Sequence, residues 1–65
     1  MFIELTQKIE LTQKKTGGKL MKIMVNVDSI QVYWQNGNET SVFVNGWDTA
    51  FNVIESYEEI RELIE

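Results

Sequence analysis

The 65-residue chain contains no cysteine, no histidine and no proline. Without cysteine there is no disulfide, and without cysteine or histidine the usual zinc sites are excluded. The same absences remove the thiol nucleophile and the imidazole base on which many nucleophilic enzymes depend. The sequence also lacks a glycine-rich phosphate loop that ends in Lys-Ser or Lys-Thr. It therefore favours a protein that is not an enzyme and that holds no cofactor and no metal.

Long hydrophobic runs are also missing. No apolar run approaches the roughly 18 residues that cross a membrane, and the first residues lack the basic start and apolar core of a signal peptide. We expect a cytoplasmic or particle-associated protein without membrane insertion. Residues 1–65 are expected to form a single domain, which at this size buries only about 60% of its unfolded surface. Association with a second copy is then the remaining source of stability.

Charge is distributed unevenly along the chain, whose net charge is −4. Residues 1–22 hold five lysines against two glutamates, a net +3, and residues 23–65 hold one arginine against eight acids, a net −7. Three interpretations remain open: two solvated faces, a basic end of one subunit that meets the acidic end of the next, or a basic grip on nucleic acid. The overall negative charge disfavours nucleic acid, because phosphate binding depends on net positive fields.

A direct repeat opens the chain, because IELTQK occupies residues 3–8 and again residues 9–14. Strand side chains alternate with a period of two, so a shift of six residues keeps each residue on its face. In a helix the second copy would lie about 120° away from the first. The apolar positions that alternate with mostly polar ones are Ile3, Leu5, Ile9 and Leu11. The repeat therefore predicts one half-buried strand over about 2–14.

Parity predicts the register of the first hairpin, since directly opposed residues must share a face. Pairing Leu11 with Ile23 leaves the three-residue loop Thr16-Gly17-Gly18, which is a favoured hairpin length. In this register residues 2–5 overhang the second strand. We expect this overhang to pair with a neighbouring subunit, and fraying is the alternative.

Downstream, short turn sequences separate further alternating segments, and Asn-Gly pairs at 36–37 and 45–46 are typical of hairpin turns. The last segment has apolar residues at helical spacing, and Ser56 followed by Glu59 is a capping-box pattern. We predict an α+β protein, a small antiparallel β-meander of about five strands followed by one C-terminal α-helix. The strands are expected at about 2–14, 19–27, 30–35, 39–44 and 47–53, and the helix at about 56–64.

The segments MVNVDSI and FNVIESYEEIRELI resemble the FlbD-like family of small proteins, which occur in flagellar and swarming-motility gene neighbourhoods and, in similar form, in phages and prophages. The positions that match the family pattern are Ile9, Leu11, Thr12, Val25, Asn26, Asp28, Ile30, Val53, Glu55, Ser56, Glu58, Glu59 and Ile60. The resemblance covers about residues 9–64, and the first IELTQK copy departs from it. It implies an accessory protein without catalytic residues, located in a bacterial or phage-infected cell or on the virion.

The leading functional hypothesis is a homo-oligomeric structural or interaction module. Apolar residues occupy both faces of the predicted sheet, and one short helix cannot cover both. The main apolar set, expected in the core, includes Ile23, Val25, Val32, Val42 and Val44. The residues expected at an oligomer interface are Phe2, Ile3, Leu5, Leu20, Met24, Tyr33, Phe43 and Trp47.

The alternative hypothesis is a nucleic-acid-binding regulator that uses the basic first hairpin. Its lysines are Lys14, Lys15, Lys19 and Lys22. Trp34 and Trp47 would stack on bases in that case, although both fit the core or an interface more simply.

Overall fold

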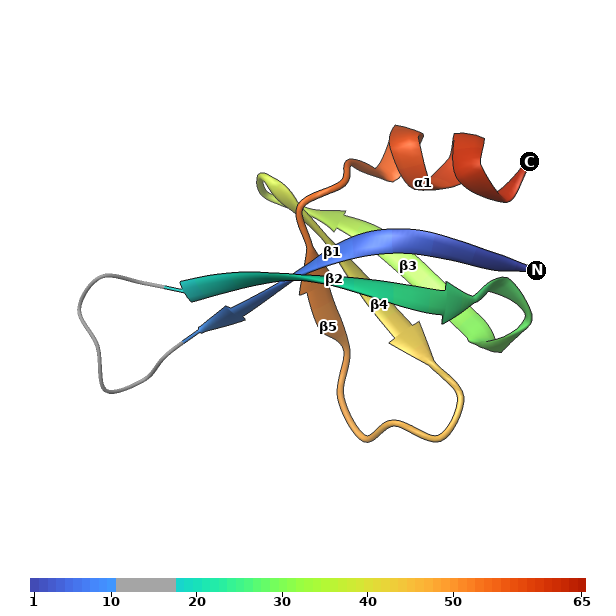
Figure 1. Cartoon of the computed structure of the whole chain (residues 1–65), viewed down its shortest axis with the longest axis horizontal. Helices are drawn as coiled ribbons and strands as arrows, with labels where there is room; N and C mark the ends of the chain where they lie inside the picture. Colours follow the sequence, from blue (N-terminus) through green and yellow to red (C-terminus); the bar gives the residue numbers. More distant parts are fainter. Residues whose placement is uncertain (11–17) are drawn as a thin grey trace.

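The computed structural model describes residues 1–10 and 18–65, with the backbone alone at positions 10 and 18. The described residues form a five-stranded antiparallel sheet followed by a C-terminal helix (Figure 1). The strands are β1 (Phe2–Glu10), β2 (Gly18–Asn26), β3 (Ile30–Asn36), β4 (Glu39–Val44) and β5 (Phe51–Val53); the helices are the 3-10 helix η1 (Val27–Ser29) and α1 (Tyr57–Ile64). The predicted α+β class is therefore confirmed.

The sheet has the strand order β2-β1-β5-β4-β3, so β2 and β3 are the two edge strands although they follow each other in the chain. Only η1 joins them, and three residues span at most about 11 Å. The two edges must therefore approach each other at this corner, which curls the sheet. Backbone hydrogen bonds from Val27 N to Met1 O (2.8 Å) and from Asn45 N to Ser29 O (2.8 Å) tie the corner to β1 and to the end of β4.

The register of the first hairpin differs from the predicted one by six residues. Leu5, and not Leu11, lies opposite Ile23, and residues 2–5 are paired with β2 along their whole length. The predicted overhang is therefore wrong. The two copies have the same sequence, so the alternation of apolar and polar residues does not determine which copy pairs with β2. The observed register places Ile9 opposite Lys19, whereas the predicted one would place Lys15 there, and opposed like charges destabilise a sheet.

The predicted first strand, 2–14, is described only as far as Glu10; its residues 11–14, with Thr16 and Gly17 of the predicted loop, lie outside the described residues. The predicted strand 47–53 is shorter in the structure, because β5 begins only at Phe51. The chain leaves β4 through Gly46, whose φ of 86° favours glycine, and Trp47 then stacks on Phe51 with ring centroids 4.9 Å apart. This stacking folds the 47–50 segment into a loop instead of extending the strand.

The hydrophobic core lies inside the curled sheet, and α1 contributes one side chain to it. The buried apolar residues are Ile3, Leu5, Val25, Val42, Val44, Phe51, Val53 and Ile60. The predicted capping box begins α1: Ser56 Oγ accepts a hydrogen bond from Glu59 N (3.1 Å), and Glu59 Oε1 accepts one from Ser56 N (2.8 Å). Among the side chains of α1, Ile60 is fully buried and so anchors the helix.

Replacement of Ile60 by alanine tests this anchor. We expect Ile60→Ala to lower the free energy of unfolding by about 2–5 kcal/mol, because it removes a fully buried side chain and leaves a cavity. Leu63→Ala, on the exposed side of the same helix, is the matched control and should cost far less. Urea unfolding followed by circular dichroism measures both, and equal losses would show that Ile60 does not anchor the helix.

Candidate self-association surface

The outer face of the β1–β2 hairpin carries exposed apolar side chains. Phe2, Leu20 and Met24 are exposed to 62%, 57% and 62%, and we call these three the hairpin patch. They lie on the even-numbered face of the two strands, opposite the face that supplies Ile3 and Leu5 to the core. This surface therefore presents apolar side chains that no described part of the chain covers.

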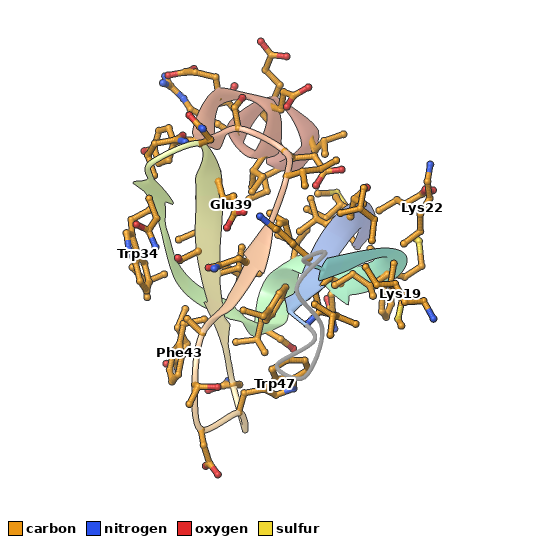
Figure 2. The ribbon with its side chains drawn as sticks, turned by 90° about the vertical axis from the view of Figure 1, so that its left-hand side faces the viewer. Lys19, Lys22, Trp34, Glu39, Phe43 and Trp47 are labelled. Carbon is orange, nitrogen blue, oxygen red and sulfur yellow. The ribbon has the colours of Figure 1, made fainter. Side chains whose placement is uncertain are left out.

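A second apolar surface lies on the outer face of β3 and β4. Val32 pairs with Phe43 and Trp34 pairs with Ser41, and we call Val32, Trp34 and Phe43 the sheet patch. Val32 and Trp34 are exposed and Phe43 is partly exposed; Figure 2 shows Trp34 and Phe43 on the same side of the molecule. Ser41 is buried here and donates a hydrogen bond to Asn52 Oδ1 (2.8 Å), which links this face of β4 to β5.

A β-bulge explains why Val32 and Tyr33 occupy the opposite faces from those predicted. The pairing of β3 with β4 shifts between Ile30 and Val32, so the extra residue Gln31 inverts the alternation that follows. Tyr33 therefore turns inward, where its ring lies 5.1 Å from that of Tyr57, and Val32 turns outward. The prediction of Val32 in the core is wrong for this reason, and Tyr33 lies partly buried on the inner face.

Of the other residues predicted at an interface, two lie in the core. Ile3 and Leu5 are buried, because β1 is paired on both sides. Phe2, Leu20 and Met24 do lie together, and Phe43 belongs to the sheet patch. Strand alternation predicted that Leu20 and Met24 share the outer face of β2, which the structure confirms, whereas it gave no signal for the bulge.

Trp47 lies at an open groove of about 360 Å³ between β2 and the loop that follows β4. The lining residues are Gln7, Ile23, Met24, Val25, Asn26, Ser29, Val44, Asn45, Trp47 and Phe51. None of them is charged, so the groove offers neither a carboxylate nor an ammonium group for acid–base chemistry or phosphate binding. Its chemistry suits apolar contact.

Hydrogen bonds and an ion pair hold β1 beside β4 and the end of β5. Thr6 donates from its backbone N to Glu55 Oε1 (2.8 Å) and from Oγ1 to Glu55 Oε2 (2.9 Å). Lys8 Nζ lies 2.7 Å from Glu39 Oε2. Thr40 Oγ1 donates to the backbone O of Glu55 (2.7 Å). In the part of the chain that the structure describes, no buried side-chain nitrogen or oxygen lacks a partner, so these groups serve the fold.

The acidic residues gather around α1. Glu4, Glu55, Glu59, Glu62 and Leu63 line a shallow depression of about 300 Å³ between β1 and the helix. Arg61 is shared between Glu58 (3.7 Å) and Glu65 (3.5 Å). The β1–β2 hairpin runs along the molecule's 37 Å long axis, and its open end, at the N-terminus, lies at the same end of that axis as α1 (Figure 1). Some opposite charges of the two halves of the sequence meet, since Lys22 pairs with Glu4 (3.3 Å), which lines the depression beside α1, and Lys8 pairs with Glu39 (2.7 Å).

Among the described residues, the lysines of β2 and Trp34 do not share one surface. Lys19 and Lys22 are exposed on β2, and Trp34 lies on the opposite side of the molecule (Figure 2). Lys14 and Lys15 lie outside the described residues. Over residues 1–10 and 18–65, no group of three acidic side chains is placed to hold a metal ion, and no described helix is long and apolar enough to cross a membrane.

No family model, no curated protein and no solved structure matches the chain. The function is therefore inferred from the fold and surface of the protein: a curled five-stranded sheet with one helix, two outward apolar patches and an uneven distribution of charge.

Tyr33 makes the free energy of unfolding depend on pH in the alkaline range. Burial raises the pKa of its hydroxyl above the ordinary value of 10.0, and Tyr57 adds to the rise. A raised pKa means that the folded state holds the proton more tightly than the unfolded state does. This stabilisation is present below pH 10.0 and is lost as the pH rises through the folded-state pKa.

We therefore expect the free energy of unfolding to fall as the pH rises above 10.0. Tyr33→Phe should show a shallower fall, because phenylalanine carries no titrating hydroxyl. Urea unfolding at a series of alkaline pH values measures both slopes. Identical slopes would show that Tyr33 titrates alike in the folded and unfolded states.

Proposed function

We propose that this protein is a small non-enzymatic accessory module that acts by binding further copies of itself. The observation that carries the proposal is the balance of apolar surface in the described residues. Eleven large hydrophobic side chains are exposed, whereas eight hydrophobic side chains are buried. Exposed apolar side chains that cluster into patches mark interaction sites. A chain this short also has little core of its own, and a second copy supplies the missing burial.

The uneven charge of the chain supports a head-to-tail contact between copies. The exposed lysines of β2, Lys19 and Lys22, lie on either side of Leu20 of the hairpin patch in the sequence, and α1 carries acidic side chains beside the exposed Leu63 and Tyr57. Each of these two surfaces thus combines apolar side chains with charge, and the signs are opposite. In this arrangement the hairpin patch of one copy packs on α1 of the next, and the charges set the orientation.

A head-to-tail contact uses different surfaces on the two partners, so its repetition produces a closed ring or an open filament. Both are structural assemblies, as the FlbD-like resemblance of the sequence also implies. We propose on that resemblance that the module serves a phage or a motility system of a bacterium. The sheet patch remains available for a further contact within such an assembly.

Native mass tests the self-association directly. By light scattering after gel filtration at tens of micromolar, we expect a mass that is a multiple of the 7.6 kDa chain. The pair Leu20→Ser and Met24→Ser should lower the mass toward that of the single chain, because it removes exposed apolar area from the contact. Ile54→Ser is the matched control, since it makes the same kind of change at an exposed position outside the patches. A wild-type protein that stays monomeric would end the proposal.

Charge reversal tests the head-to-tail orientation. We expect Lys19→Glu with Lys22→Glu to weaken self-association, because two acidic ends would then meet. Adding Glu58→Lys and Glu62→Lys in the same chain should restore it, since both ends are then reversed together. The native mass should also fall at high salt, which screens exposed charges. A mass insensitive to these changes would rule out docking of the hairpin on α1.

A further inference from the structure

The space between β2 and β5 that holds β1, which we call the β1 slot, contacts every residue of the first IELTQK copy. Ile3 and Leu5 are buried in the core. Glu4 forms an ion pair with Lys22 (3.3 Å). Thr6 binds Glu55, Gln7 lies opposite Val53, and Lys8 binds Glu39. Each of these six residues therefore has a contact in the slot, in this order along β1.

The second copy, residues 9–14, carries the same six residues in the same order. The offset of six is even, so a shift by one copy keeps each side chain on its face of the sheet. Leu11 can replace Leu5 in the core, and Thr12 can replace Thr6 at Glu55. We propose that the β1 slot accepts either copy, so that the chain folds in two hairpin registers six residues apart.

The two registers differ in the residue pairs at the two ends of the hairpin. In the observed register Phe2 faces Asn26, and Ile9 faces Lys19. In the second register Lys8 faces Asn26 and Lys15 faces Lys19, and the second pair brings two like charges together. Against this, the second register shortens the hairpin loop to Thr16-Gly17-Gly18, which reduces the entropy lost on closing it. These effects oppose each other, and the six residues that the slot contacts are the same in both registers.

A change of register alters the surface of the protein. In the second register residues 1–6 leave the sheet as an N-terminal arm, and Phe2, Ile3 and Leu5 become exposed. The backbone carbonyl of Gln7 takes the position from which Met1 O accepts the hydrogen bond of Val27 N. The rest of the sheet and α1 are unchanged. This behaviour lies within one chain and does not depend on self-association.

Alanine substitutions in each copy test the proposal by urea unfolding. For registers of equal stability, Leu5→Ala and Leu11→Ala should each lower the folding equilibrium constant by at most about twofold, because the molecule uses the intact copy. The double variant should lower it by on the order of a hundredfold or more, since it leaves no leucine for a fully buried position. If Leu5→Ala alone is as damaging as the double variant and Leu11→Ala is silent, the proposal is wrong.

Engineered disulfides show directly which register forms, because the chain has no native cysteine that could compete. Glu4 faces Met24 in the observed register, and Glu10 would face Met24 in the second. Both intramolecular disulfides should form on oxidation in dilute solution, in Glu4→Cys/Met24→Cys and in Glu10→Cys/Met24→Cys. Glu4→Cys/Leu20→Cys is the matched control, since these positions oppose each other in neither register.

Non-reducing mass analysis separates intramolecular from intermolecular products. Monomeric disulfides in both test variants, with none in the control, would support two registers. A disulfide in Glu4→Cys/Met24→Cys alone would overturn the proposal, as would a product of Glu10→Cys/Met24→Cys that is only a covalent dimer.

Discussion

The fold depends on the pairing of β1 with two neighbours at once. On one side β1 pairs with β2 along nine residues, and on the other it meets β5 through a short contact at Gln7. That short contact is reinforced by the hydrogen bond from Ile54 N to Thr6 O (3.0 Å) and by the two hydrogen bonds that Thr6 donates to the Glu55 carboxylate. Without it, the sheet would divide into the β1–β2 hairpin and the β3–β5 unit, joined only by η1. The core, which draws residues from both parts, would then open.

The curl that encloses this core also determines what stays outside. A sheet of five strands has two faces, and curling hides one of them. The single helix does not cover the other face, because α1 spans eight residues and packs through Ile60 at one end of the curl. The hairpin patch and the sheet patch follow from this geometry. Self-association is the remaining way to bury this apolar surface in a chain with no disulfide and no metal site of the usual kind.

Several features of the fold were predictable because they depend on local chemistry. The capping box needs only Ser56 and Glu59 three residues apart, and Asn36-Gly37 is a turn that the structure confirms, with Gly37 at a φ of 66°. Alternation alone correctly placed Leu20 and Met24 on the outer face of β2. Only part of the candidate surface was predictable from the sequence. The sheet patch depends on the bulge at Gln31, and nothing in the sequence of β3 marks that bulge.

The sequence by itself determined the α+β class, the capped helix and the side of the sheet on which Ile3, Leu5 and the residue between them lie, because these follow from periods of two and 3.6 residues and from short-range hydrogen bonding. Tertiary structure decided the strand order, the inversion of Val32 and Tyr33, and the slot beside β5 that an IELTQK copy occupies. These choices depend on contacts between residues far apart in the chain, such as Thr6 with Glu55. A repeat of even length satisfies the local pattern equally well in either register, so only the surroundings of β1 can distinguish the two.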